Sequence, residues 1–319
     1  MSLLGHEQAW QAWRSAMGGT RMHHAWLLAG RKGIGKASFA LAAAHELVVE
    51  GHAPGPASHP DIIRLANLPA TSDDEKKRDE GKPYQTKRNI NVEQIRAMQQ
   101  RLTTRPTLGS RRAIIIDPVD DLEKAAANAL LKSLEEPPTG TFFMLISHVP
   151  GRLLPTIRSR CRLLSFPDIP AEDIVQLLRD AAPQADEPTR MAAVAASSGS
   201  VGRALEFVEL DLGAMYKVME QIAREGDPNF VLRGRLSEAM GTRPTRARQM
   251  AALELARAVV STRLDTLGRE EIPALTDAHG ELSRLSAQAP TYNFDPGLLV
   301  MEIGTLLAGM AASRKTANV

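Results

Sequence analysis

The chain has 319 residues, 43% of them hydrophobic and 24% charged, which is the balance of an ordinary water-soluble protein with room for two or three domains. Its formal charge of +2 does not indicate a protein built mainly to bind nucleic acid. The single cysteine, Cys161, excludes a disulfide framework and a cysteine-rich zinc site. No apolar run reaches membrane-spanning length, and the first residues lack a signal-peptide pattern. We therefore expect a cytoplasmic protein without membrane contact.

The first strongly patterned stretch predicts a phosphate-binding loop. After an amphipathic helix that ends near Met17, residues 24–29 predict a strand and residues 36–49 a helix. The turn between them carries Gly30, Gly33, Gly35 and Lys36. Glycines let consecutive backbone N–H groups curl around phosphate oxygens, and the helix N-terminus adds partial positive charge. We therefore expect these glycines to cradle a nucleotide and Lys36 to reach its β- and γ-phosphates. The alternative is an ordinary glycine turn with a surface lysine, but spacing and context favour the loop.

One position departs from the phosphate-loop pattern. The pattern ends in Ser or Thr, whose hydroxyl binds Mg²⁺, but this chain has Ala37 there. Ser38 comes one residue late and would point roughly 100° around the helix. The sequence thus allows weak ATP binding, and we expect Mg²⁺ to be held poorly.

The stretch from residue 51 to residue 103 combines loops with two regular elements. Residues 51–58 are rich in Pro, Gly and Ala and predict a loop, and residues 59–65 predict a strand. Residues 71–88 are highly charged and poor in apolar residues, so we expect a mobile surface loop. A helix follows over residues 89–103.

The most informative stretch runs from Arg111 to Phe166. Ala113–Asp117 is a short apolar run that predicts a strand buried on both faces, as in a parallel sheet. A helix over residues 120–136 ends before two prolines. Residues 142–146 predict a second buried strand, which Ser147 follows, and residues 163–166 close the stretch.

Two segments of this stretch resemble bacterial clamp-loader subunits of the AAA+ class. They are Asn128–Pro138 (NALLKSLEEPP) and Ile157–Cys161 (IRSRC), and Ser159-Arg160-Cys161 matches that family's arginine-finger motif. The resemblance is dense from Ala25 to Phe166. It implies an α/β AAA+ P-loop domain with a parallel sheet over residues 1–167, a small three-helix lid over 168–210 and an all-α collar over 211–319, in which Asp295 caps the last helix and Pro296 opens it.

The resemblance also assigns roles in the nucleotide site. Asp117 matches the Walker B aspartate that holds Mg²⁺, and Ser147 falls at the sensor-1 position. Pro118 stands where an active AAA+ enzyme has the glutamate that polarises water, and Gly202 stands at the sensor-2 arginine, with Arg203 one position late. We therefore expect the chain's own ATPase activity to be absent or weak.

Zinc and DNA are two further expectations that depend on the resemblance. The family usually has a four-cysteine zinc module near residues 51–58, but this chain has only His52 and His59 there, so we expect no zinc and no other metal site. In clamp loaders the arginine that matches Arg96 faces DNA; a solvated helix face is an equally good reading. Arg101, Arg105, Arg111 and Arg112 are expected to add positive charge nearby.

Three functional hypotheses follow. The first is a largely rigid clamp-loader subunit of DNA polymerase III that supplies Arg160 in trans to a neighbour's ATP site during DNA replication. The second is an active gamma/tau-type motor ATPase, and the third is a DNA-binding module with a vestigial nucleotide fold. Ala37, Pro118 and Gly202 argue against the second, and the low net charge argues against the third. The first implies gamma/tau and delta subunits as partners, the sliding clamp indirectly, and primed DNA through the assembled complex.

Overall fold

The computed structural model describes residues 6–19, 22–49, 59–263, 272–289 and 294–317. The chain divides into two compact units, Met1–Asp168 and Ile169–Val319.

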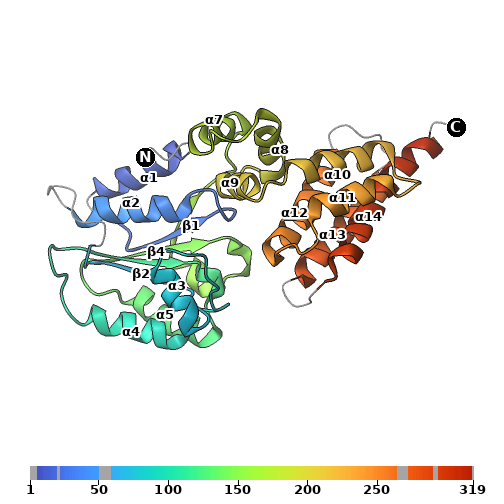
Figure 1. The fold of residues 1–319 in the computed structure, drawn as a ribbon. Helices are drawn as coiled ribbons and strands as arrows, with labels where there is room; N and C mark the ends of the chain where they lie inside the picture. Colours follow the sequence, from blue (N-terminus) through green and yellow to red (C-terminus); the bar gives the residue numbers. More distant parts are fainter. Residues whose placement is uncertain (1–5, 20–21, 50–58, 264–271, 290–293, 318–319) are drawn as a thin grey trace. The chain divides into compact units, whose positions relative to one another are not determined.

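A five-stranded parallel sheet forms the centre of the first unit (Figure 1). Its strands lie in the order β2-β3-β4-β1-β5. Every residue of β1 is buried, as the continuous apolar run predicts for a strand covered on both faces. The strand bounds are β1 Ala25–Ala29, β2 Ile62–Ala66, β3 Arg112–Asp117, β4 Thr141–Ser147 and β5 Arg162–Ser165.

Helices cover both faces of this sheet. Figure 1 shows α1 (Glu7–Met17) and α2 (Lys36–Val48) on one face, and α4 (Val92–Leu102) and α5 (Lys124–Glu135) on the other. Because side chains alternate along each strand, β1 supplies Trp26 and Leu28 to the core under α2 and Ala25 and Leu27 to the core over α5. The short helix α6 (Pro155–Arg158) contributes the buried Ile157 to the core over α5.

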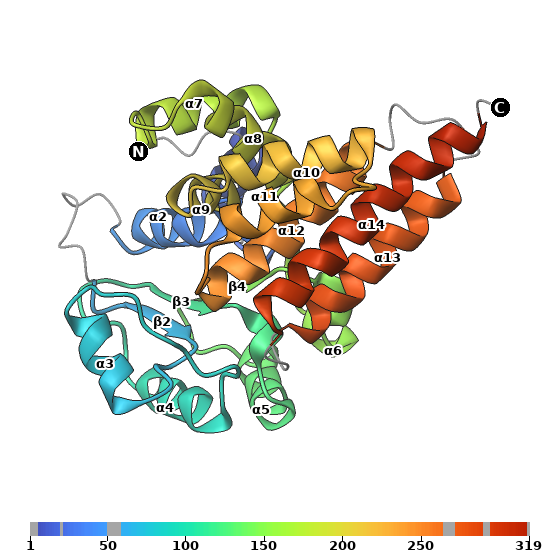
Figure 2. The same ribbon diagram turned by 45° about the vertical axis from the view of Figure 1, so that its right-hand side comes forward.

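The charged stretch after β2 is a correction to the sequence analysis. Where a mobile loop was expected, the structure has the helix α3 (Ser72–Asp79), which is labelled in Figure 2. The Thr71 hydroxyl caps it by accepting a hydrogen bond from the backbone N–H of Asp74 at 3.2 Å. The Asp74 carboxylate in turn accepts the N–H of Gln85 at 3.0 Å. Local capping therefore orders a segment that composition alone marked as unstructured.

The second unit is entirely helical in its described residues. One apolar core runs through it, from Ile169 in the first helix region to Met310 in the last helix. Asp295 caps α14 by accepting the N–H of Leu298 at 2.9 Å, and Pro296 occupies the first helical position, so both expectations are confirmed. The helices are α7 Ala171–Ala181, α8 Glu187–Ser197, α9 Val201–Glu209, α10 Gly213–Glu225, α11 Val231–Met240, α12 Arg246–Thr262, α13 Ile272–Gln288 and α14 Pro296–Ala317.

The two units together confirm the expected fold class, a parallel α/β domain followed by a helical part. The finer division into a lid over 168–210 and a collar over 211–319 stays a prediction. Within the described ranges, the chain has no helix that combines the length and apolar character of a membrane span.

Candidate nucleotide site and arginine segment

The turn between β1 and α2 has the backbone geometry that its glycines allow. Gly33 and Gly35 have φ angles of 82° and 98°, a left-handed region that side-chain-bearing residues rarely adopt. At Gly30 an added Cβ would lie only 2.4 Å from the backbone oxygen of Phe166, so this position also requires glycine. The structure therefore brings Gly30, Gly33 and Gly35 together at the N-terminus of α2, as the sequence predicts; phosphate binding there stays a prediction.

Lys36 turns back into this loop. Its side chain is only 3% exposed, and its Nζ donates hydrogen bonds to the backbone oxygens of Gly30 at 2.6 Å and Arg31 at 2.5 Å. Burial lowers the pKa of Lys36 to about 8, and the nearby carboxylates of Asp117 and Asp120 offset part of that effect. The positive charge of Lys36 is thus stabilised by two backbone oxygens and by two nearby carboxylates.

Asp117, at the end of β3, is paired with Arg64 of β2. The Arg64 Nη2 lies 2.9 Å from Asp117 Oδ2, and the Asp117 side chain is 16% exposed. Ala66 is the register partner of Asp117, so Arg64 lies two residues earlier on the same face of β2 and reaches diagonally to the carboxylate. Sequence reasoning missed Arg64. The sequence shows that apolar residues flank Arg64 in β2, but it does not show that β2 pairs with β3.

Ser147 is buried at the end of β4 and is bonded to a carboxylate that sequence reasoning also missed. Its hydroxyl donates to Asp120 Oδ1 at 2.8 Å, and the backbone N–H of His148 donates to Asp120 Oδ2 at 2.6 Å. Asp120 was expected to start a helix. Instead it lies in a 3₁₀ turn, Val119–Asp121, and α5 begins only at Lys124. Asp120 therefore joins the end of β4 to the turn after β3, and the sensor-1 role of Ser147 stays a prediction.

The expectation that Mg²⁺ is held poorly stays a prediction. Ala37 has no hydroxyl, Asp117 is paired with the exposed Arg64, and Asp120 accepts hydrogen bonds from Ser147 and a backbone N–H group. Among the residues that the structure describes, no three His, Cys, Asp or Glu side chains are grouped so that they could hold a metal ion.

The expectation that the chain lacks zinc stays a prediction. His52 lies outside the described residues. His59 Nδ1 accepts the backbone N–H of Asp61 at 3.2 Å, so its ring has a local structural role.

Arg160 lies just after α6 and is held by two contacts. Its Nη2 is 2.6 Å from Glu135 Oε1 at the C-terminus of α5, and its Nη1 donates to the backbone oxygen of Thr156 at 2.9 Å. The side chain remains 34% exposed. Burial raises the pKa of the adjacent Cys161 thiol to about 12, so this cysteine is an uncharged packing residue.

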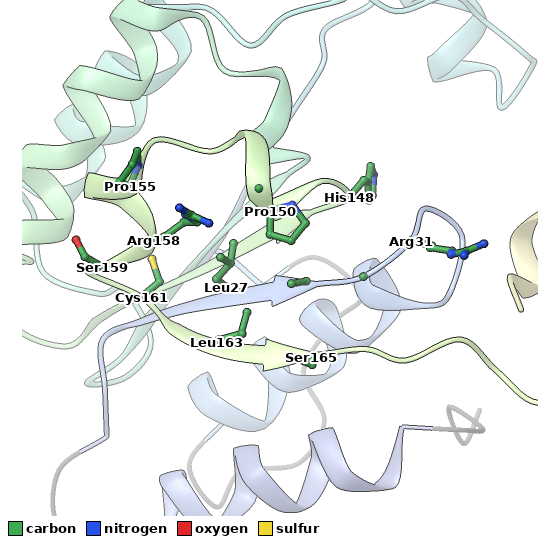
Figure 3. A pocket seen from close by; sticks show the side chains of 13 residues that line it. Leu27, Arg31, His148, Pro150, Pro155, Arg158, Ser159, Cys161, Leu163 and Ser165 are labelled. Carbon is green, nitrogen blue, oxygen red and sulfur yellow. The ribbon is translucent and has the colours of Figure 1, made fainter. Parts of the chain in front are cut away.

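A cavity of about 800 Å³ adjoins both functional segments (Figure 3). Its walls come from β1, β5, the phosphate-loop residues Gly30 and Arg31, and the segment that carries Arg158, Ser159 and Cys161. It lies on the face of β1 away from α2, because Leu27 lines it and belongs to the core over α5. The phosphate loop and the arginine segment therefore border the same hollow from different elements.

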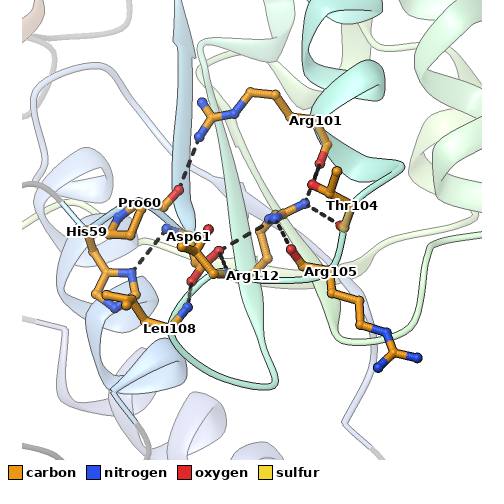
Figure 4. Close-up of polar contacts among 9 residues, drawn as sticks. His59, Pro60, Asp61, Arg101, Thr104, Arg105, Leu108 and Arg112 are labelled. Carbon is orange, nitrogen blue, oxygen red and sulfur yellow. Dashed lines mark hydrogen bonds and ion pairs between the residues drawn. The ribbon is translucent and has the colours of Figure 1, made fainter.

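The arginines near α4 differ in role, which corrects the expectation that they all add surface charge. Arg112 is buried; its guanidinium lies 3.6 Å from Asp61 and donates to the backbone oxygens of Arg101, Thr104 and Arg105 (Figure 4). The Arg105 side chain points away from this cluster in Figure 4. Arg96 is exposed on α4, and within the described part of the chain it forms no hydrogen bond or ion pair. Arg112 is thus structural, whereas Arg96 is available to a ligand.

The segment that the resemblance assigns to sensor 2 lies at the start of α9 in the second unit. Gly202 is exposed there and offers no side chain. The Arg203 guanidinium forms an ion pair with Glu254 of α12 at 2.5 Å, and its backbone N–H bonds to the Ser200 hydroxyl, which caps the helix. Arg203 is therefore engaged inside its own unit.

Comparisons with known proteins are consistent with this arrangement. A family model described as DNA polymerase III, delta subunit, matches residues 5–170. The delta prime subunit of DNA polymerase III from Pseudomonas aeruginosa is 35% identical over 192 residues, which cover 56% of this chain and 53% of that protein. The Escherichia coli delta prime subunit is 31% identical over 204 residues, covering 60% of this chain and 56% of that protein.

Matches at lower identity include gamma and tau subunits. The tau/gamma subunit of Haemophilus influenzae is 28% identical over 221 residues, which cover 65% of this chain and 30% of that protein. A solved gamma-subunit-related protein of Thermotoga maritima aligns with a TM-score of 0.49 at 19% identity, covering 94% of this chain and 98% of that one. The chain spans about half the length of the delta prime relatives that it matches. Because the family model matches more than half of the chain, the chain belongs to the family of the DNA polymerase III delta subunit, with delta prime clamp-loader subunits among its relatives.

Proposed function

We propose that this chain is a delta prime clamp-loader subunit that completes a neighbour's ATP site with Arg160 and does not run an ATPase cycle of its own. The observation that carries this proposal is a contrast between two sites. Arg160 is partly exposed and held ready by Glu135, whereas Asp117, the metal-binding position of the chain's own site, is paired with Arg64. The neighbour would be a gamma/tau subunit, and the assembly would load the sliding clamp onto primed DNA with the delta subunit.

The chemistry of phosphoryl transfer explains the role proposed for Arg160. Negative charge develops on the γ-phosphate oxygens, and an arginine supplied by another subunit can raise the rate by about 10³–10⁵. The planar guanidinium stays charged and can bond two oxygens at once. Its resting pair with Glu135 is partly exposed, and such pairs contribute roughly 0–1 kcal/mol, so Arg160 can exchange Glu135 for phosphate at little cost.

The chain's own site lacks the groups that hydrolysis needs. Pro118 follows Asp117 and cannot orient or deprotonate a water molecule. Ala37 leaves Mg²⁺ without one of its usual protein ligands, and Arg64 competes with the metal for a second, Asp117. Lys36 and the glycine loop remain, which supports weak nucleotide binding without turnover.

A contact with primed DNA is a subsidiary part of the proposal. Arg96 is exposed on α4 without a partner among the described residues, so it can bind a phosphate. Such a contact is independent of base sequence and weakens with salt. It would act only in the assembled complex, because the chain has a formal charge of just +2.

Two measurements on the purified chain test the proposal. The chain should co-purify with gamma/tau and delta subunits, and alone it should hydrolyse ATP negligibly with or without primed DNA and clamp. A chain that stays monomeric beside both partners would contradict the clamp-loader assignment. Robust turnover by the chain alone that disappears in Lys36→Ala would instead support the motor-type alternative.

A further inference from the structure

We infer that Arg64 takes the place of a divalent cation beside Asp117, so that the chain's own site binds the phosphates of a nucleoside triphosphate without Mg²⁺. This inference rests on the proposed nucleotide loop and goes beyond it, because it assigns a charge-compensating role to a residue of β2. The AAA+ fold implies a bound Mg²⁺, but this chain has Ala37 in place of one usual ligand and an arginine beside the other, Asp117.

The position of Arg64 follows from the sheet. Residues of β2 alternate, so Ile63 and Leu65 enter the core over α5 while Arg64 lies on the face that α2 covers. Asp117 lies on that same face, because Ala113 and Ile115 of β3 belong to the core under α2. The guanidinium therefore approaches Asp117 from the strand next to β3, at 2.9 Å. Asp117 Oδ2 is therefore paired with a cation of the chain itself, although the Arg64 side chain is 56% exposed.

The charges around the loop make this substitution effective. Lys36 and Arg64 bring two positive charges, and Asp117 and Asp120 bring two negative charges, so these four groups are balanced. Among these four groups, removing Arg64 would leave two carboxylates against the single ammonium of Lys36 and make the site less favourable for a triphosphate. A divalent cation normally removes that repulsion by bridging β- and γ-phosphate oxygens. Here Arg64 neutralises Asp117 before any ligand arrives.

The test measures binding of a fluorescent ATP analogue, trinitrophenyl-ATP, in EDTA and in MgCl₂. For the wild-type chain we expect dissociation constants within about twofold of each other in the two buffers. Arg64→Ala exposes the Asp117 charge, so we expect its affinity in EDTA to fall about tenfold or more and to recover in MgCl₂. Adding Asp117→Asn to Arg64→Ala removes the repulsion and should restore binding in EDTA. Arg105→Ala, which removes an exposed arginine elsewhere in the same unit, is the matched control and should bind like the wild type.

Each other outcome would overturn the inference. A wild-type chain that needs Mg²⁺ for binding would show that Arg64 does not compensate Asp117. Equal losses in Arg64→Ala and Arg105→Ala would show only a general effect of net charge. Absence of binding by the wild type in both buffers would also refute it, but would leave the role of Arg160 intact, because that role is measured by hydrolysis in the neighbouring subunit. Thermal unfolding of each variant shows whether it has folded.

Discussion

Lys36 carries its positive charge in surroundings that disfavour the charge. Burial lowers its pKa to about 8 from the ordinary value of 10.5, against the opposing effect of Asp117 and Asp120. We predict that NMR of the ¹³C-methylated chain will show one lysine that titrates near pH 8 and whose signal is missing in Lys36→Arg. A spectrum in which every lysine titrates near 10.5 would contradict the buried position of this amine.

The sign of the linked stability change follows from that pKa. Because the folded chain binds this proton less tightly than the unfolded chain, the cost of burying the charge is fully present below about pH 8. It disappears as the pH rises from about 8 towards 10.5. The contribution of Lys36 to folding stability should therefore increase over that window, and the Lys36→Arg variant, which stays charged, should lack the increase.

At the scale of single residues, the sequence predicts the groups whose roles depend on local spacing. Gly30, Gly33, Gly35 and Lys36 are recognised because their geometry depends on a turn between neighbouring elements. Arg64 could not be found in this way. Its contact with Asp117 spans 53 positions and depends on which strands pair and in what register.

At the scale of elements, the loop between α4 and β3 depends on the buried pair Asp61–Arg112 (Figure 4). Burial alone would raise the pKa of Asp61, but the N–H groups of Leu108 and Thr107 and the charge of Arg112 outweigh burial and hold the pKa below its ordinary 3.8. The stabilisation from Asp61 is therefore present above pH 3.8 and lost as the pH falls through its lower folded value.

Removing Arg112 should destabilise this loop strongly. Arg112→Leu leaves the Asp61 carboxylate buried without its cation and three backbone oxygens without their donor, so we expect a loss of about 3–5 kcal/mol in the free energy of unfolding. Urea denaturation at pH 7 measures the loss. Arg105→Leu is the matched control. Arg105 contributes only its backbone oxygen to this cluster, so its substitution should change the free energy of unfolding by no more than about 0.5 kcal/mol. Equal effects of the two substitutions would contradict the structural role of Arg112.

The elements themselves were predictable to different degrees. Strands β1, β3 and β4 follow from short apolar runs, because strands covered on both faces need no polar alternation. A strand was also predicted at β2, which alternates, whereas β5 was not predicted as a strand. The helix α3 was missed because its residues are almost all charged and its stability comes from Thr71 and Asp74, which bind the ends of the segment. The start of α5 was placed too early because Asp120, which resembles a helix cap, is bonded to Ser147 instead.

At the scale of the whole molecule, each of the two units has its own apolar core. Composition predicts the helical character of the second unit, but the lid and collar assignments came from the family resemblance alone. The proposed function is concentrated in the first unit. There, the glycine loop after β1 and the segment that carries Arg158 and Ser159 border one cavity.

The measurement that tests the central proposal most directly is ATP hydrolysis by a clamp loader reconstituted with Arg160→Ala. Saturating variant is assembled with wild-type gamma/tau and delta subunits, and DNA-stimulated hydrolysis at the neighbouring site is followed together with clamp loading. We predict intact assembly and a hydrolysis rate at that site lower by about 10³-fold or more, with little rescue by Arg160→Lys. Arg158→Ala, which removes a second exposed arginine from the same segment, and Glu135→Gln, which removes only the resting partner, should both retain most of the activity. Wild-type rates for Arg160→Ala in a fully assembled complex would contradict the proposal and leave Arg160 as a surface ion pair.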